Sequence, residues 1–311
     1  MKTIIKTGLC VGLAATVMAG GWWGVRHART AKERKGEAAL REVPYPRIVS
    51  LSPALTEALY ALGLGEHVVA VTRFCDYPPE AKALPKVGSL IDVDMEAVVR
   101  FRPDVVVAPP SLAHIRMVLD QMKNPSYALT LKTDRLHEIF DAMWALGDAL
   151  GRQEAAVAWL SEMEETMANA KRIADEKFAA TQERPKVLLC IGRDGEGLSR
   201  VYVAGPNTFY DDIITAVGGV NAYTGLLSYP IVAAEGLIQM NPDIIVEICL
   251  PYVGGETVGG AQVVSQWGAW TDISAVRSVH VYVITDDWAV RPGPRIGLLV
   301  QRLSDILHGY P

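Results

Sequence analysis

The sequence predicts an α/β protein with two βα lobes, each with a parallel sheet, joined by one long backbone helix. β-rich runs alternate with helical patterns on both sides of a proline-free segment. A helix–Pro–Asp–strand unit also occurs twice, as EAVVRFRPDVVV from Glu96 and as EGLIQMNPDIIV from Glu235. Strand, helix and strand at this spacing are typical of parallel sheets.

The N-terminus is predicted to lie outside the fold. Lysines followed by an apolar run make residues 1–25 a signal peptide or a membrane anchor. Val17-Met18-Ala19 offers a small-residue cleavage site, although the run is also nearly long enough to span a bilayer. Residues 26–45 form a polar tether. The expected location is periplasmic or otherwise extracytoplasmic, with an uncleaved segment anchored in the cytoplasmic membrane as the alternative.

The N-terminal α/β lobe is assigned to residues 46–150. Short β-branched runs end at turn residues, and helical spacing of leucine and alanine follows the first of them. The predicted strands are 47–53, 67–72, 104–109 and 127–131, and the predicted helices are 54–65 and 94–102.

One long amphipathic helix is predicted to link the lobes, and it is assigned to residues 151–182. No proline occurs between Asp134 and Thr181. Apolar side chains recur there at steps of three or four, which predicts a core-packing stripe rather than a cofactor site. The stripe is Leu160, Met163, Met167, Ala170, Ala174 and Phe178.

The C-terminal α/β lobe is assigned to residues 183–311, because the βα pattern restarts after Pro185. The predicted strands are 186–192, 201–205 and 278–285, and the predicted helices are 207–219 and 295–309, with the second copy of the repeated unit between them.

Composition and motifs argue against catalysis and against nucleic acid as a partner. The formal net charge is −5, whereas phosphate binding needs a basic face. No nucleophile elbow or phosphate-binding loop is present, and no two histidines have metal-pair spacing. No enzyme activity, metal site or cofactor is therefore expected. The cysteines beyond the signal, Cys75, Cys190 and Cys249, are odd in number and are predicted to be packed thiols.

Aromatic and polar residues follow the predicted strands, where α/β sheets hold ligands. RFCDYPPEA follows 67–72, PPSLAH follows 104–109, RDGEG follows 186–192 and DDWAVRPGPR follows 278–285. LLSYPIVAAE places Tyr229 just before Glu235. Several such loops at equivalent strand ends predict one shared binding cleft.

RIVSLSPALTEALYALG, DYPPEA, LPKVG, the repeated RPDVVV unit and DDW…PGPR resemble the periplasmic binding proteins of ABC importers for metal chelates. The resemblance runs from about Arg47 to the C-terminus. It implies a monomeric, bilobed protein with a rigid helical backbone, a ligand cleft between the lobes and small closure on its ligand. It also implies an ABC permease dimer in the membrane as partner, with Glu96 and Glu235 docking on permease arginines. A favourable position at a helix N-terminus is the other explanation of the two glutamates.

Within the family, the vitamin B12-binding branch is the most similar, which implies a corrinoid ligand. Tyr77 and Trp288 match its aromatic positions, whereas Tyr229, Leu90 and Pro109 stand where tryptophans are expected. A ferric siderophore, held by arginines such as Arg73 and Arg291, or haem, with His114 as an axial ligand, is the alternative. The predicted ligand-binding residues are Asp76, Tyr77, Arg193, Tyr229, Trp288 and Arg295.

Overall fold

The computed structural model describes residues 44–122, 126–179, 183–193, 197–250 and 259–310. The predicted signal or anchor and nearly all of the tether lie outside the described residues. Tyr45–Pro311 forms one compact unit. Within the described ranges, no helix has both the length and the apolar character needed to cross a bilayer.

The first sheet is wholly parallel, as predicted, with the strand order β2-β1-β3-β4. Its two central strands, β1 and β3, pair in register, with Val49 of β1 opposite Val106 of β3. β1 and β3 are buried throughout, because helices cover both faces of such a sheet. The strands are β1 (Ile48–Ser50), β2 (Val68–Val71), β3 (Val105–Ala108) and β4 (Tyr127–Thr130).

The helices of the first half begin at residues that favour helix starts. Pro53 occupies the first turn of α2, where its missing N–H costs nothing. The Asp94 carboxylate caps α4 by accepting a 2.9 Å hydrogen bond from the Ala97 N–H. The helices are α2 (Pro53–Ala61), α3 (Pro79–Lys82), α4 (Met95–Arg100) and α5 (Ile115–Gln121), with 3-10 turns η1 (Gly65–His67) and η2 (Pro110–Leu112).

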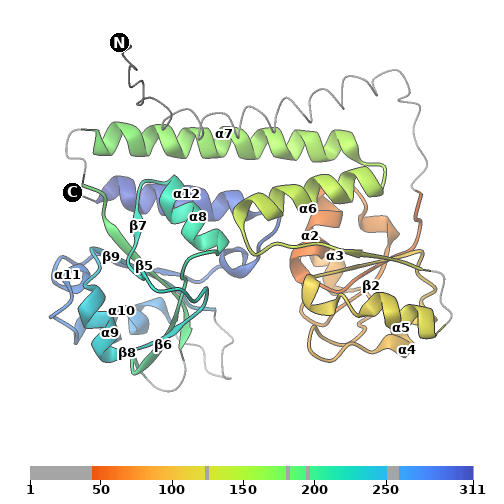
Figure 1. The fold of residues 1–311 in the computed structure, drawn as a ribbon, viewed down its shortest axis with the longest axis horizontal. Helices are drawn as coiled ribbons and strands as arrows, with labels where there is room; N and C mark the ends of the chain where they lie inside the picture. Colours follow the sequence, from red (N-terminus) through yellow and green to blue (C-terminus); the bar gives the residue numbers. More distant parts are fainter. Residues whose placement is uncertain (1–43, 123–125, 180–182, 194–196, 251–258, 311) are drawn as a thin grey trace, which may run out of the picture. The chain divides into compact units, whose positions relative to one another are not determined.

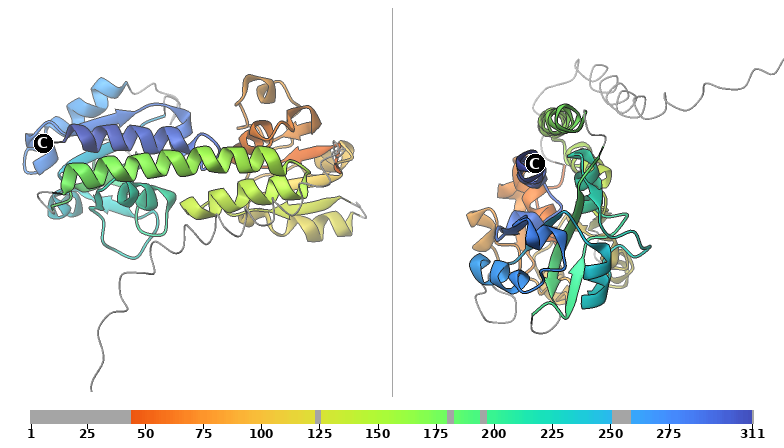
Figure 2. Two further views of the ribbon diagram at one scale, coloured as in Figure 1. Left: turned by 90° about the horizontal axis from the view of Figure 1, so that it is seen from above. Right: turned by 90° about the vertical axis from the view of Figure 1, so that its left-hand side faces the viewer.

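The proline-free segment forms two helices, α6 (Leu136–Ala149) and α7 (Gln153–Phe178). Gly151 separates them with a φ of +71°, a conformation that glycine adopts without strain. α7 lies within the predicted 151–182 range and runs alongside α6 and α12 (Ile296–Gly309) (Figures 1 and 2). The predicted stripe is confirmed, since all of its residues are buried except Met167, which is partly buried against the same core. The lobe boundaries at 150 and 183 stay a prediction.

The second sheet is mixed, which corrects the prediction of a parallel sheet in this half. The order is β10-β9-β5-β6-β8, with β7 beside β5. β6 runs antiparallel to β5 and β8. Only six residues separate β5 from β6, too few for a parallel crossover. The strands are β5 (Lys186–Arg193), β6 (Arg200–Val203), β7 (Val220–Asn221), β8 (Ile231–Ala233), β9 (Ile244–Ile248) and β10 (Val281–Ile284).

Two apolar clusters cover the second sheet. One joins β5 and β9 to α6, α7 and α12, and it includes Ile139, Met163 and Leu303. The other surrounds the fully buried Trp267. The remaining elements are α8 (Phe209–Ala216), α9 (Ala234–Met240), α10 (Gly260–Gly268), α11 (Ser274–Arg277) and η3 (Asp287–Val290). The first half means the first sheet with α2 to α5, and the second half means the second sheet with α8 to α12.

Candidate ligand-binding site

A buried glutamate of the first half holds two arginines of the second. Glu57, on α2, is only 2% exposed. Arg295 donates to both of its carboxylate oxygens, from Nε at 2.8 Å and from Nη2 at 2.6 Å. Arg291 Nη1 donates to Glu57 Oε1 at 3.0 Å. A buried charge needs such partners, so this contact fixes α2 against the segment before α12.

Two further carboxylates complete this arginine–carboxylate cluster, which consists of Glu57, Asp76, Asp287, Arg291 and Arg295. Asp76 Oδ1 lies 2.5 Å from Arg291 Nη2. Asp287 lies 3.0 Å from Arg295 and 3.1 Å from Arg291. Burial opposes the charge of Asp287, but the hydrogen bond from Arg295 and the two positive charges hold its pKa below the ordinary value. Three acids against two bases leave the cluster with a formal charge of −1.

Tyr77 lies on this cluster. The Arg295 guanidinium sits 3.8 Å from the centre of the Tyr77 ring, within the range of a cation–π contact. Cys75, two residues before Tyr77, is a buried thiol. Its sulfur lies 3.2 Å from the Thr56 hydroxyl and 3.1 Å from the Thr72 hydroxyl. The prediction of a packed Cys75 is thus confirmed, and this packing fixes the loop that carries Asp76 and Tyr77.

Trp288 and Tyr229 belong to the second half. Trp288 lies on η3, partly buried against the core. The next residue, Ala289, accepts a 2.9 Å hydrogen bond from the Tyr210 hydroxyl. Burial raises the pKa of Tyr210, and the nearby Tyr229 raises it further. Partial burial, with a smaller effect of the Asp134 charge, raises the pKa of Tyr229 itself to about 12.

Arg193, at the end of β5, belongs to a different network. Its Nε and Nη2 atoms lie 2.7 and 2.6 Å from the Glu247 oxygens, and Nη1 also donates to Gln266. Trp267 Nε1 donates to the same carboxylate at 2.6 Å. The structure therefore places Tyr77 directly on Arg295 and links Asp76 to Arg295 through Arg291 and Glu57, whereas Arg193 lies in the core of the second half. Neighbouring Cys190 is buried, as predicted, and burial raises its pKa.

Sequence reasoning missed Glu57, which anchors the cluster. Its position among Leu55, Ala58 and Leu59 on a buried helix was the available signal, because an acid on an apolar face needs a partner. It also missed exposed apolar side chains in the loops. These are Phe74, Ile91, Leu226 and Leu227. Leu90, which stands near an expected tryptophan, is exposed, and so is His114.

Glu96 and Glu235 occupy matching positions in the two halves. Each lies exposed in the first turn of its helix, α4 or α9. Neither side chain makes a hydrogen bond or ion pair with the residues that the structure describes. α4 and α9 both lie on the side of their sheets away from α7 (Figure 1). Their docking role stays a prediction.

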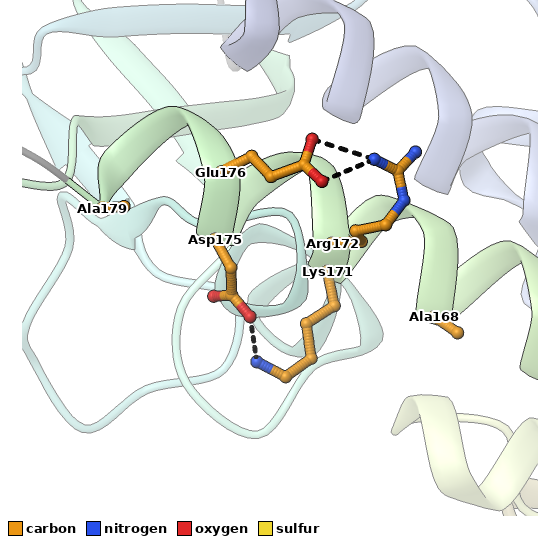
Figure 3. A pocket seen from close by; sticks show the side chains of 6 residues that line it. All are labelled: Ala168, Lys171, Arg172, Asp175, Glu176 and Ala179. Carbon is orange, nitrogen blue, oxygen red and sulfur yellow. Dashed lines mark hydrogen bonds and ion pairs between the residues drawn. The ribbon is translucent and has the colours of Figure 1, made fainter.

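The outer face of α7 carries a shallow depression of about 560 Å³. Figure 3 shows its lining, in which Lys171 pairs with Asp175 and Arg172 with Glu176 at i,i+4 spacing. Such exposed pairs are typical of a solvated helix face and contribute little. None of the predicted ligand-binding residues lines this depression. In the described ranges, no group of three His, Cys, Asp or Glu side chains could hold a metal ion.

A match to a known protein family identifies the class of protein to which the chain belongs. The family described as "Periplasmic binding protein" matches residues 48–288. The chain belongs to this family. This is a family of substrate-binding proteins for transport rather than a family of enzymes. The absence of catalysis in this chain stays a prediction.

Related periplasmic binding proteins cover most of the chain. The uncharacterized ABC transporter substrate-binding lipoprotein YvrC of Bacillus subtilis is 28% identical over 267 residues, which are 84% of this chain and 80% of that one. The vitamin B12-binding protein of Pectobacterium atrosepticum is 26% identical over 264 residues, 84% of this chain and 88% of that one. The structure of the periplasmic heme-binding protein RhuT from Roseiflexus sp. RS-1 has a TM-score of 0.69 at 26% identity, with 84% of this chain and 97% of that one covered.

Proposed function

We propose that this periplasmic binding protein is exported, captures a corrinoid and delivers it to the permease of an ABC transporter. The permease partner follows from relatives named as ABC transporter substrate-binding proteins. The corrinoid follows from relatives named vitamin B12-binding protein and from the character of the candidate site.

The observation that carries the ligand class is the neutralisation of the arginines. Arg193, Arg291 and Arg295 are each paired with carboxylates, and the arginine–carboxylate cluster has an excess negative charge. The alternative prediction is a ferric siderophore held by arginines. The excess negative charge of the cluster would repel such an anionic ligand. Exposed aromatic side chains, Phe74, Tyr77 and Tyr229, instead suit a large ligand with apolar faces.

Haem is the second candidate, because a heme-binding protein shares this fold. Its propionates need cations, and Arg73 is an exposed arginine at the site with no carboxylate partner among the described residues. A tyrosinate ligand would require a deprotonated phenol, which the raised pKa of Tyr229 opposes. A corrinoid with amide side chains makes neither demand, so we rank it first.

Calorimetric titration of the full chain tests the proposal. Cyanocobalamin, haemin and a ferric siderophore are compared under the same conditions. One-to-one binding of cyanocobalamin alone is the expected result. Binding of haemin alone, or of the siderophore with a strong loss of affinity at high salt, would replace the corrinoid with that chelate.

A double variant tests the aromatic residues. Tyr77→Ala with Trp288→Ala should weaken chelate binding at least about tenfold, because stacking surface is lost on both halves of the site. The unfolding transition of the variant is measured alongside, since Arg295 rests on Tyr77. Unchanged affinity in a folded variant would remove both residues from the site.

A further inference from the structure

Two loops display pairs of aliphatic side chains to solvent. We call Leu90–Ile91 and Leu226–Leu227 the aliphatic tips. Ile91 is 98% exposed and Leu226 is 92% exposed, whereas Tyr77 and Tyr229 are 41% and 43% exposed. Side chains that line a binding site are partly covered by its walls even when it is empty. Ile91 and Leu226 therefore point away from the body of the protein, whereas Leu90 and Leu227 are 43% and 64% exposed.

The first aliphatic tip is a tight turn with unfavourable residues at its centre. Ser89 N–H donates to the Asp92 carbonyl at 2.8 Å, and Asp92 N–H donates to Ser89 Oγ at 3.1 Å. Gly88 and Val93 pair below it. Glycine, asparagine, aspartate, serine and proline favour turn centres, and β-branched isoleucine does not. The preference of residues for turn centres does not account for leucine and isoleucine at positions 90 and 91. These side chains are therefore available for contacts with another molecule.

The second aliphatic tip is also held by its backbone. Gly205 N–H donates to the Ser228 carbonyl at 2.7 Å, and Val203 N–H donates to the Pro230 carbonyl at 3.0 Å. A Cβ at Gly205 would lie 2.1 Å from the Leu227 carbonyl oxygen, so only glycine permits this approach. The loop is fixed against β6 while its leucine side chains stay in solvent.

Each aliphatic tip leads directly to one of the exposed glutamates. Ile91 precedes Glu96 by five residues, which span at most roughly 18 Å of chain. Leu227 precedes Glu235 by eight residues, which include β8 and span at most roughly 29 Å of chain. The same combination, an exposed aliphatic pair and then an exposed first-turn glutamate, thus occurs once in each half.

From this repetition we propose that the aliphatic tips are apolar docking contacts, which insert into two pockets of the permease beside the sites for Glu96 and Glu235. The inference rests on the proposed function and extends it. Charge pairs with the glutamates would orient docking more than they would add affinity, and apolar contacts would supply affinity. A bilayer is a poorer occupant, since Glu96, Glu235 and the net charge of −5 oppose anionic lipid. Solvent-exposed aliphatic pairs flanked by charge are typical of a protein interface.

Site-specific photo-crosslinking in living cells tests the contact without any chelate. p-Benzoylphenylalanine replaces Ile91 or Leu226 in the full chain, and Val279, which is 79% exposed but precedes no such glutamate, is the matched control position. Adducts at 91 and 226 with the same multi-spanning membrane protein, and none at 279, are expected. Adducts with lipid or with a soluble protein, equal adducts at all three positions, or no adducts would overturn the proposal.

A serine variant separates this inference from the proposed function. Serine replaces Ile91, Leu226 and Leu227 together, and both cyanocobalamin affinity and radiolabelled cyanocobalamin uptake are measured. Unchanged affinity with uptake reduced about tenfold is expected, a loss typical of removing a buried interface side chain. Loss of affinity would show that the aliphatic tips contact the ligand instead, and normal uptake would also contradict docking. If the parent chain bound no cobalamin, the proposed corrinoid ligand would be wrong. The crosslinking result would still test the docking contact, because it needs no chelate.

Discussion

Glu57 lies on α2 between leucine and alanine side chains, and its carboxylate is out of contact with water. Removing a charge from water is costly, so the two guanidinium groups that meet it are part of the folded structure rather than free to bind an anion. The same arginines contact Asp76 and Asp287, which remain accessible. One buried residue therefore sets the charge of the whole site.

Replacing Glu57 with glutamine should destabilise the protein by about 3 kcal/mol, at the low end of the cost of breaking a buried ion pair, because other acids still contact both arginines. Denaturant unfolding measures this change. Glu176→Gln is the matched control, since Glu176 pairs with Arg172 on the exposed face of α7. Its effect should stay below about 1 kcal/mol. Equal effects of the two substitutions would show that Glu57 is no more important than a surface pair.

Tyr229 predicts a pH dependence of stability. Its pKa is about 12 in the folded chain against an ordinary value of 10.0, so the folded state holds the proton more tightly. The stabilisation is complete below the unfolded pKa and is lost as pH rises through the folded pKa. The parent should therefore lose stability between about pH 10 and about pH 12 more steeply than Tyr229→Phe. Unfolding free energies across this range measure the difference, and parallel curves would contradict it.

The loop before β8 depends on one close backbone approach. Gly205→Ala would push its new methyl group into the Leu227 carbonyl, and neither backbone can yield cheaply. We expect a loss of about 1–3 kcal/mol, as for other overpacked sites, together with weaker chelate binding through displaced Tyr229. Gly268→Ala, at the end of α10 with open space around it, is the control and should change stability by less than about 1 kcal/mol. Stability and affinity equal to the control would show that the loop can shift freely.

Most elements could be predicted from local patterns, whereas contacts between distant elements could not. Continuous buried runs such as those of β1 and β3 identify strands without any tertiary information. The direction of β6 depends on a short connection to β5, so the βα pattern alone misassigned it as parallel. The pairing of Glu57 with Arg291 spans 234 residues, and no spacing rule reveals such a partner. The prediction that Arg193 binds the ligand has the same limit. Its partner Glu247, which also accepts from Trp267, is distant in sequence and approaches Arg193 only in the folded chain.

At the scale of the molecule, the two halves share a layout. Each has a sheet, an exposed glutamate at the start of a helix and an exposed aliphatic pair before it. α7 packs against both α6 and α12, while the arginine–carboxylate cluster joins α2 to the segment before α12. A long helix and a buried ion cluster that both connect distant parts of the chain favour small changes on ligand binding. We therefore expect the spacing between Glu96 and Glu235 to be nearly the same with and without ligand.

We propose that the two glutamates dock on the permease at two points of fixed spacing, and a paired substitution tests this role. Glu96→Ala with Glu235→Ala should leave chelate affinity unchanged and reduce chelate uptake by cells at least about tenfold, since both charge pairs with the permease are lost. Glu80→Ala with Glu154→Ala is the matched control, because these are also exposed first-turn acids, on α3 and α7. If the glutamates serve only their own helix dipoles, both double variants should show the same small loss of stability and normal uptake. Reduced uptake in the first variant alone would assign the repeated glutamate to the permease.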